Sequence, residues 1–150
     1  MEPLVSADAA QSLAERSAAA MYADDRASQA LGMRIIDIRP GYAKLSMIVR
    51  EDMLNGHAVC HGGLIFSLAD SAFAFACNSH GGVAVAAAAS IDFLAPAHGG
   101  DELTAEAVER WRSKRSGVYE ATVVNQRGET IALFRGRSHR MREPLGIQQV

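Results

Sequence analysis

The apolar and polar positions divide the chain into a helical beginning, several strand-like runs and one long apolar helix that interrupts the strands. Residues 6–21 consist mainly of good helix formers and begin at Ser6, a favourable N-cap residue. Residues 24–31 predict a second short helix or a continuation of the first, and Gly32 is a suitable residue to end it. The sequence therefore predicts a helical segment before any strand.

Later runs that are β-branched or that alternate between apolar and polar residues predict at least five strands, within residues 33–39, 42–49, 83–94, 103–111, 118–124 and 130–138. Turn residues such as Pro40 and Gly41 separate neighbouring runs, and short links of this kind predict mostly antiparallel pairing. The alanine content of residues 83–90 would by itself allow a helix. We predict a strand there because glycines precede the run and Pro96 follows it closely.

The long apolar helix is expected to begin at Gly62 and Gly63 and to end near Asn78. It is apolar on nearly every side, which is typical of a helix that is buried in a core. A sheet can bury such a helix only by curling around it. The pattern therefore predicts an α+β fold in which a curled antiparallel sheet wraps around one long buried helix, with the N-terminal helix in addition.

A narrow polar stripe interrupts this helix at Ser67, Asp70 and Ser71, which are spaced so that they share one face. Burying a carboxylate without a partner costs several kcal/mol. Chains keep such a group either in a satisfied hydrogen-bonding network or as a working group in a functional site. Asp70 is therefore the leading candidate for a functional residue.

Composition excludes several classes of protein. The 150 residues fit one domain, and 49% hydrophobic residues, 21% charged residues and a net charge of −2 disfavour a basic nucleic-acid binder. The N-terminus lacks a secretory signal, and the longest wholly apolar run, residues 83–89, is too short to cross a bilayer. Two cysteines do not make a disulfide framework. We therefore expect a cytoplasmic protein with no nucleic-acid and no membrane partner.

Two alternative kinds of site involve the histidines and cysteines near the helix. Cys60 and His61 could act as nucleophile and base, but sequence neighbours usually point apart and no third orienting group is evident. His57, Cys60 and His61, with Cys77 or His80, could bind zinc, but the paired spacing of a zinc site is missing. The helix serines also lack the Gly-x-Ser-x-Gly turn of a serine hydrolase.

Gly62 and Gly63 indicate a different chemistry. They open a helix, where free backbone N–H groups, aided by the helix dipole, can polarise a carbonyl oxygen. Asp70 lies on the same helix, and Asn55 and His61 lie in the polar segment that precedes it. An acyl-transfer site is therefore the favoured interpretation.

The sequence resembles the phenylacetate-degradation (PaaI-type) thioesterases of the hotdog superfamily in six segments: Met53-Leu-Asn-Gly-His57, Cys60-His-Gly-Gly63, Phe66-Ser-Leu-Ala-Asp70, Ala76-Cys-Asn78, Ile91-Asp-Phe-Leu94 and Leu133-Phe-Arg-Gly-Arg-Ser-His139. The match runs from about residue 21 to about residue 140 and is dense enough to be specific. It implies a hotdog domain over residues 21–141, with an N-terminal helical extension over residues 1–20 and a C-terminal tail over residues 142–150.

The resemblance also implies an activity, the hydrolysis of arylacetyl-CoA thioesters to the free acid and CoA in phenylacetate catabolism. Phenylacetyl-CoA and its ring-hydroxylated forms are the expected substrates, and no cofactor and no metal are implied. The implied assembly is a homotetramer, a dimer of dimers, with active sites at the dimer interface. Helix geometry agrees, because Gly62 and Asp70 lie about 12 Å apart along a straight helix. One reacting carbon can meet both only if two chains contribute.

Carried over residue by residue, the resemblance matches Asp70 to the catalytic carboxylate and the Gly62 amide to the donor that polarises the carbonyl. Asn55 matches a polar residue that orients the thioester or water, and His61 lies in the same lead-in. Ser71 stands where relatives often have threonine, so the hydroxyl is kept. Asp70 either attacks the carbonyl to form a mixed anhydride or removes a proton from water, and the sequence leaves both routes open.

Further substrate contacts are expected from residues of the helix and the last strand, namely Gly63, Phe73, Arg135, Arg137 and Ser138. The CoA phosphates could meet the arginines of that strand. They could instead meet a second basic group near Trp111, which consists of Arg112, Lys114 and Arg115.

Two other functions stay open. A hotdog dehydratase or hydratase would use a histidine with an acid residue for proton transfer, and His57 or His61 could serve. A non-enzymatic acyl-CoA-binding module would need no chemistry at Asp70. Release of free CoA from a thioester distinguishes the thioesterase from both.

Overall fold

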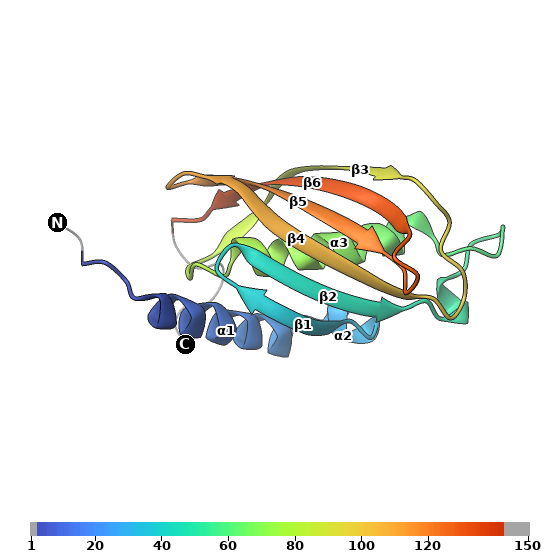
Figure 1. Cartoon of the computed structure of the whole chain (residues 1–150), viewed down its shortest axis with the longest axis horizontal. Helices are drawn as coiled ribbons and strands as arrows, with labels where there is room; N and C mark the ends of the chain where they lie inside the picture. The colour runs from blue at the N-terminus through green and yellow to red at the C-terminus, as the bar shows by residue number, and fades with distance from the viewer. Residues whose placement is uncertain (1–2, 143–150) are drawn as a thin grey trace.

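The computed structural model describes residues 3–142 and contains a strongly curved sheet that wraps around one long helix (Figure 1). The sheet has six strands: β1 (Arg34–Arg39), β2 (Tyr42–Ile48), β3 (Ala84–Phe93), β4 (Glu102–Arg112), β5 (Ser116–Val124) and β6 (Thr130–Arg140). Their order across the sheet is β1-β2-β4-β5-β6-β3, and every neighbouring pair is antiparallel. The predicted curled antiparallel sheet is confirmed, and each predicted run corresponds to one strand.

The long helix α3 (Gly62–Cys77) lies inside the curve of the sheet and follows β2 and the short helical turn η1 (Glu51–Met53) in the chain. Residues of β5 alternate between buried and half-buried, and most residues of β6 alternate between buried and exposed. Because side chains of a strand point to opposite faces in turn, the buried set packs against α3 and the other set forms the convex surface. None of the helices in residues 3–142 combines the length and apolarity that a membrane span needs.

Gly136 in β6 allows the sheet to approach α3 closely at Phe73. The Phe73 ring centroid lies 5.5 Å from that of Tyr119 and 5.7 Å from that of Phe134. A Cβ atom at Gly136 would lie 2.9 Å from the Phe73 ring. Interiors are packed too densely to absorb such a contact without movement, so a side chain at this position would push the ring or the strand away.

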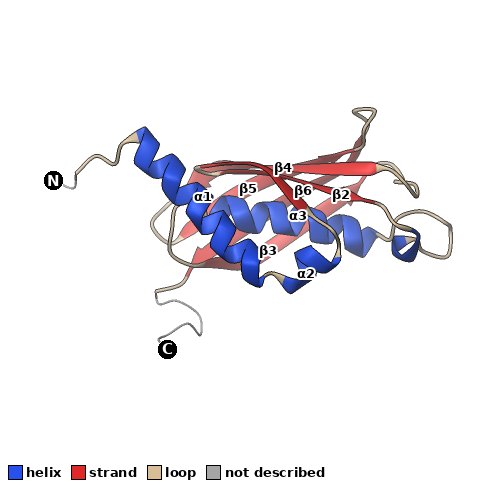
Figure 2. Cartoon of the chain, turned by 90° about the horizontal axis from the view of Figure 1, so that it is seen from below, coloured by secondary structure: helices blue, strands red, loops and turns tan. Residues whose placement is uncertain are grey.

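Two N-terminal helices, α1 (Ala7–Asp24) and α2 (Arg26–Ala30), cross the side of α3 that the sheet leaves open (Figure 2). Ser6 caps α1 as predicted, because its hydroxyl accepts from the N–H of Ala9 at 3.1 Å. The Ser17 hydroxyl donates to the carbonyl of Asn78 at 2.8 Å and ties α1 to the end of α3. The division predicted between residues 20 and 21 lies within α1, and residues 143–150 of the predicted tail lie outside the described residues.

The two edge strands of the sheet differ in how they are covered. α1 packs on β1, where the Gln11 side-chain amide donates to the carbonyl of Ile38 at 2.7 Å. Within the part of the chain that the structure describes, β3 pairs only with β6. Residues 86–90 of β3 are small and exposed and include no lysine or proline, the residues that often protect a free edge. β3 therefore presents an open edge to which another strand could pair.

Gly136→Ala is expected to lower the free energy of unfolding by about 1–3 kcal/mol, because the new methyl group overpacks against Phe73. Gly99→Ala is the matched control, since a Cβ atom there would make an ordinary contact of 3.7 Å with Leu54. The control should change the free energy of unfolding by no more than about 0.5 kcal/mol. Urea unfolding at equal protein concentrations measures both. Equal stabilities of the two variants would contradict the close approach of β6 to α3.

Candidate active site

The segment between η1 and α3 folds into a tight loop that is organised by Asn55. Asn55 Oδ1 accepts hydrogen bonds from the backbone N–H groups of His57 at 2.9 Å and Val59 at 3.4 Å. The backbone N–H of Asn55 also donates to the carbonyl of Val59 at 2.8 Å. Asn55 therefore shapes the loop through its side-chain carbonyl. Its side-chain nitrogen donates to no acceptor within residues 3–142.

The first turn of α3 leaves one backbone N–H group free. His61 is the N-cap, and its Nδ1 accepts from the N–H of Gly63 at 2.9 Å. The His61 carbonyl accepts from the N–H groups of Leu64 at 2.9 Å and Ile65 at 3.3 Å. The N–H of Gly62 has no acceptor among the described residues. The partial positive charge at a helix N-terminus makes this N–H a good donor to a negatively charged oxygen.

An apolar cavity of about 350 Å³ opens beside Gly62. The Phe93 ring lies over the glycine, so closely that a Cβ atom on Gly62 would be 3.1 Å from it. Phe93 is 53% exposed and Leu94 is 56% exposed, so two consecutive large apolar side chains lie at the surface where they line this cavity. The other walls of the cavity are Val59, Cys60, Ile65, Ala95 and Pro96. The cavity therefore suits an apolar group whose polar end reaches the Gly62 N–H.

Asp70 lies two turns further along α3 and is half-buried, with no hydrogen bond or ion pair to any described residue. Burial raises the pKa of its carboxyl group, and the charge of nearby Asp25 raises it further. Gly62 and Asp70 belong to one continuous helix, so they lie about 12 Å apart along its axis. Within residues 3–142, one chain thus offers a free donor and an unpaired carboxylate at points too far apart to act on the same carbon.

The hydroxyl groups beside Asp70 have partners. Ser67 donates to the carbonyl of Gly63 at 2.8 Å, one turn earlier in the helix. Ser71 Oγ lies 2.8 Å from the Oγ of Ser28 in α2. The N-terminal helical segment therefore reaches the residue next to Asp70.

Comparisons with known proteins place the chain in a family. The family model described as the thioesterase superfamily matches residues 57–132, which include both Gly62 and Asp70. The acyl-coenzyme A thioesterase PaaI of Escherichia coli strain K12 is 54% identical over 126 residues, which cover 84% of this chain and 90% of PaaI. The chain belongs to the thioesterase superfamily.

Solved structures extend the similarity of this thioesterase to the whole fold. The structure of E. coli PaaI superposes with a TM-score of 0.88 at 51% identity and covers 89% of this chain and 97% of that one. A mutant of the phenylacetic acid degradation protein PaaI from Thermus thermophilus gives a TM-score of 0.75 at 39% identity, over 78% of this chain and 100% of that one. The hotdog fold and the PaaI-type resemblance expected from the sequence are confirmed.

Within the thioesterase, three of the predicted substrate-binding residues are either hydrogen-bonded to another residue or buried. The N–H of Gly63 is taken up by the His61 ring. Phe73 is 1% exposed in the core, and Ser138 is 5% exposed on the helix-facing side of β6, 3.5 Å from the carbonyl of Gly117. Neither side chain reaches a surface, so we leave Phe73 and Ser138 out of the proposed site. The face of α3 on which Phe73 lies depends on helix packing, and the face of β6 on which Ser138 lies depends on strand register.

The other two predicted substrate-binding residues, Arg135 and Arg137, lie on the convex face of β6. Arg135 forms an ion pair with Glu120 at 2.9 Å. Arg137 forms no ion pair with a described residue. Both line a cavity of about 350 Å³ beside the open edge strand, together with Ala88, Ala89, Ser90, Val118 and Gly136.

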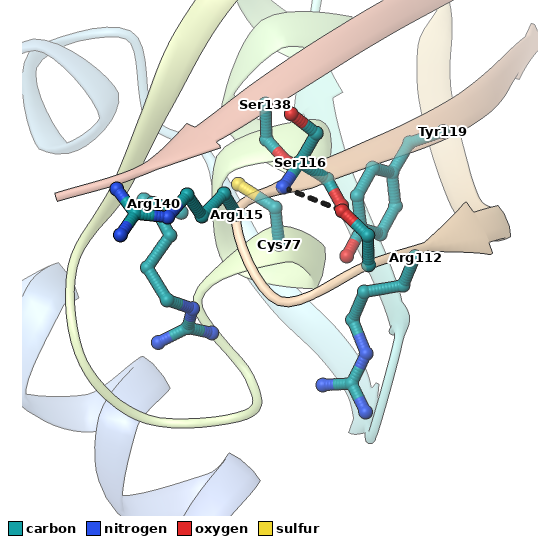
Figure 3. Close-up of a pocket in the computed structure, with 9 residues that line it drawn as sticks. Cys77, Arg112, Arg115, Ser116, Tyr119, Ser138 and Arg140 are labelled. Atoms are coloured by element: carbon teal, nitrogen blue, oxygen red, sulfur yellow. Dashed lines mark hydrogen bonds between the residues drawn. The ribbon is translucent and has the colours of Figure 1, made fainter.

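The second basic group lies around a pocket near the turn between β4 and β5 (Figure 3). Arg112 and Arg115 flank the turn between β4 and β5, and Arg140 of β6 joins them near Cys77, the last residue of α3. An adjoining open cavity of about 490 Å³ is lined by Arg112, Arg140 and Lys114. Arg112 lies 3.7 Å from a Glu109 carboxylate oxygen. This group therefore lies at the opposite end of α3 from Gly62.

The structure gives no support to the cysteine alternatives. Cys60 is 4% exposed and burial raises the pKa of its thiol, whereas Cys77 is 2% exposed and burial raises the pKa of its thiol to about 12. The thiolate is the nucleophilic form, so neither thiol is activated near neutral pH. Residues 3–142 contain no group of three His, Cys, Asp or Glu side chains that could hold a metal ion.

Sequence reasoning singled out Gly62 and Asp70 as candidates but did not indicate the walls of the apolar cavity beside Gly62. Phe93 and Leu94 belong to one of the segments that carry the family resemblance, yet they looked like ordinary strand residues. Their exposure becomes visible only when the strand is placed at the sheet edge beside α3. His61 was expected near the reaction, and the structure gives it a definite task as the helix cap.

Asp70→Asn is expected to raise the thermal stability of the protein at neutral pH. The folded-state pKa of Asp70 is raised, so its ionised carboxylate destabilises the folded state above that pKa. Below the unfolded-state pKa, close to the ordinary value of 3.8, both states are protonated and the penalty disappears. The Tm difference between variant and wild type should therefore be positive near neutral pH and shrink as the pH falls. A variant that is less stable at every pH would show that Asp70 has a structural partner.

Proposed function

We propose that this thioesterase hydrolyses acyl-CoA thioesters to the free acid and CoA, with phenylacetyl-CoA and its ring-hydroxylated forms as substrates in phenylacetate catabolism. One observation carries the proposal: the Gly62 N–H and the Asp70 carboxylate, neither with a partner in residues 3–142, lie on one helix, and an apolar cavity adjoins the N–H. The 54% identity to the acyl-coenzyme A thioesterase PaaI supports CoA thioesters as the substrate class.

The cavity beside Gly62 supports an arylacetyl group as the acyl part. Its walls are mainly apolar, and the exposed ring of Phe93 can pack against a second aromatic ring. Its volume of about 350 Å³ is at the lower end of the range for ligand pockets, about 300–1,000 Å³. Such a cavity accommodates a small acyl group and leaves the CoA nucleotide outside.

In this proposal two chains complete each site. Antiparallel pairing of β3 with the β3 strand of a second copy would provide hydrogen-bond partners for the backbone groups at the open edge. It would also extend the sheet across a two-fold axis. The two α3 helices would then run side by side in opposite directions. Gly62 of one chain would face Asp70 of the other, and two such dimers would form the homotetramer that the family resemblance implies.

The proposed mechanism uses the backbone and one carboxylate. The Gly62 N–H polarises the thioester carbonyl and stabilises the oxyanion, a contribution of about 3 kcal/mol for one donor of this kind. Asp70 either attacks the carbonyl carbon to form a mixed anhydride or removes a proton from the water that attacks it. In both routes the C–S bond breaks and the CoA thiolate takes up a proton. In the proton-transfer route the attacking water supplies the oxygen that the acid gains. In the anhydride route Asp70 first displaces the thiolate, and a water molecule then hydrolyses the anhydride, which releases the acid and restores the carboxylate. Asn55 and His61 act by holding the loop and the first turn of α3 in place.

For the CoA phosphates we favour the convex-face arginines over the hairpin group of Arg112, Lys114 and Arg115. Arg137 has no carboxylate partner among the described residues and lies beside the edge at which the second chain would pair. The hairpin group lies at the far end of α3, where Arg112 already faces Glu109. Arg135 is neutralised by Glu120, so Arg137 should contribute more of the binding energy.

A thiol-release assay with phenylacetyl-CoA tests the function. We expect saturable release of CoA, faster for arylacetyl than for long-chain thioesters. Asp70→Asn should lower the rate by about 10² or more. Hydration of an enoyl-CoA without release of CoA would indicate the dehydratase or hydratase instead. Binding of phenylacetyl-CoA without turnover would indicate an acyl-CoA-binding module.

Gly62→Pro is expected to reduce kcat/KM by about 10²–10³, because it removes the proposed oxyanion donor. Proline is well tolerated at the first position of a helix. His61 has φ −59° and ψ 131°, an extended conformation that suits a residue before proline. Gly62→Ala is the matched control, since it adds the same Cβ atom near Phe93 but keeps the N–H. Similar losses in the two variants would show that space, rather than the N–H, is what the reaction requires.

Arg137→Gln is expected to raise KM for phenylacetyl-CoA by about tenfold with little change in kcat, because a charge-assisted hydrogen bond to phosphate is lost. The double variant Lys114→Gln, Arg115→Gln removes charge from the hairpin group and should leave KM nearly unchanged. A phenylacetyl thioester of pantetheine, which lacks the nucleotide, should not distinguish Arg137→Gln from wild type. The reverse pattern would assign the phosphates to the hairpin group.

A further inference from the structure

A chain of hydrogen bonds links the joint between α1 and α2 to the residue next to Asp70. Asp25 lies at this joint and accepts from Ser28 twice, from its backbone N–H at 2.9 Å and from its hydroxyl at 2.6 Å. Ser28 Oγ in turn lies 2.8 Å from Ser71 Oγ of α3. Ser28 is only 1% exposed, so water competes little for these contacts.

The single proton of each hydroxyl group fixes the direction of this chain. The Ser28 hydroxyl donates its proton to the carboxylate of Asp25, which can only accept. At the contact between the two serines, Ser71 must therefore be the donor and Ser28 the acceptor. The Ser71 proton is directed towards α2, and the lone pairs of Ser71 Oγ remain available as acceptors.

We propose that Asp25 and Ser28 are positioning residues of this thioesterase, which keep Ser71 as a hydrogen-bond acceptor and Asp70 as a strong base. The inference rests on the proposed role of Asp70. A hydroxyl that donated to the Asp70 carboxylate would stabilise its charged form and weaken it as a base. Because the Ser71 proton is committed to Ser28, Ser71 can instead accept one proton of a water molecule whose other proton faces Asp70.

The proton-transfer route then proceeds with a defined orientation of water. Asp70 takes one proton as the water oxygen bonds to the carbonyl carbon, while the second proton stays on that oxygen and hydrogen-bonds to Ser71. The C–S bond breaks, and the leaving CoA thiolate takes up a proton, which Asp70 can supply. Neither Ser28 nor Asp25 gains or loses a proton in the cycle.

The charge of Asp25, like the hydrogen-bond chain, favours Asp70 as a strong base. Burial is the main reason that the pKa of Asp70 is raised, and the charge of Asp25 is the second. Cys77, two turns further along α3, is influenced by the charge of Asp70, but its thiol is neutral because burial raises its pKa to about 12. Among residues 3–142, Asp25 is therefore the charged group that acts on Asp70.

Asp25→Asn tests the proposal because it reverses the chain without removing the cap of α2. Asparagine is as good an N-cap as aspartate and can still accept from the Ser28 N–H. Its side-chain nitrogen would donate to Ser28, so Ser28 would donate to Ser71 and free the Ser71 proton to turn towards Asp70. With phenylacetyl-CoA, kcat should fall about tenfold with KM unchanged. The acid limb of the pH profile of kcat/KM, where the rate falls as the pH decreases, should move to lower pH.

Asp24→Asn is the matched control, because it makes the same change of charge at an exposed residue one position earlier. It should leave kcat, KM and the acid limb as in wild type. Ser28→Ala is the second variant: it removes the acceptor for Ser71 but keeps the charge of Asp25. Its kcat should also fall, and its acid limb should move less than that of Asp25→Asn.

The outcomes separate this inference from the proposed function. A folded Asp25→Asn variant with the kcat and acid limb of wild type overturns the inference. If Asp25→Asn does not fold, an unchanged kcat in Ser28→Ala overturns it. A wild-type protein that releases no CoA, or an Asp70→Asn variant with full activity, overturns the proposed function instead.

Discussion

The continuous course of α3 is the constraint on which the rest of the structure depends. The helix runs without a break from Gly62 to Cys77, and the sheet curls around it to bury its apolar sides. It therefore holds the Gly62 N–H at its start and the Asp70 carboxylate in its middle at a separation of about 12 Å. That separation cannot change without breaking backbone hydrogen bonds. A single chain thus contains all the chemical groups of the proposed site but cannot bring them together.

The surroundings of Asp70 favour reactivity over stability. A half-buried carboxylate with no partner in residues 3–142 destabilises the folded state, and its pKa is raised by burial and by Asp25. The rest of the fold stabilises the chain by ordinary means, such as the packing of Phe73 under Gly136 and the docking of α1 on β1. Functional sites often contain a group that is locally unfavourable for stability and that the rest of the fold tolerates. The N-terminal helices also reach this site, through Ser28 and Ser71.

Much of the fold could be predicted from the sequence, because the period of its apolar pattern changes where the elements change. Even the alanine-rich run at residues 83–90 is identified as a strand by its flanking glycines and proline. Gly62 and Asp70 are visible because a glycine pair and an acid stand out against an apolar helix. The sequence does not show on which face of its helix or strand Phe73 or Ser138 lies. Burial depends on how each element packs, and a shift of one residue in register moves every side chain of a strand to the opposite face. The link from Asp25 to Ser71 is also hidden, since it joins residues that only tertiary packing brings together.

The central claim, that two chains form each site, is tested most directly by mixing two defective chains. Gly62→Pro chains lack the donor and Asp70→Ala chains lack the carboxylate, so each should be nearly inactive alone. With random pairing half of the dimers are mixed, and each mixed dimer has one of its two sites intact, so the mixture should regain roughly a quarter of wild-type activity. Mixed dimers that are confirmed by native mass spectrometry but stay as inactive as either parent would contradict a site shared between chains.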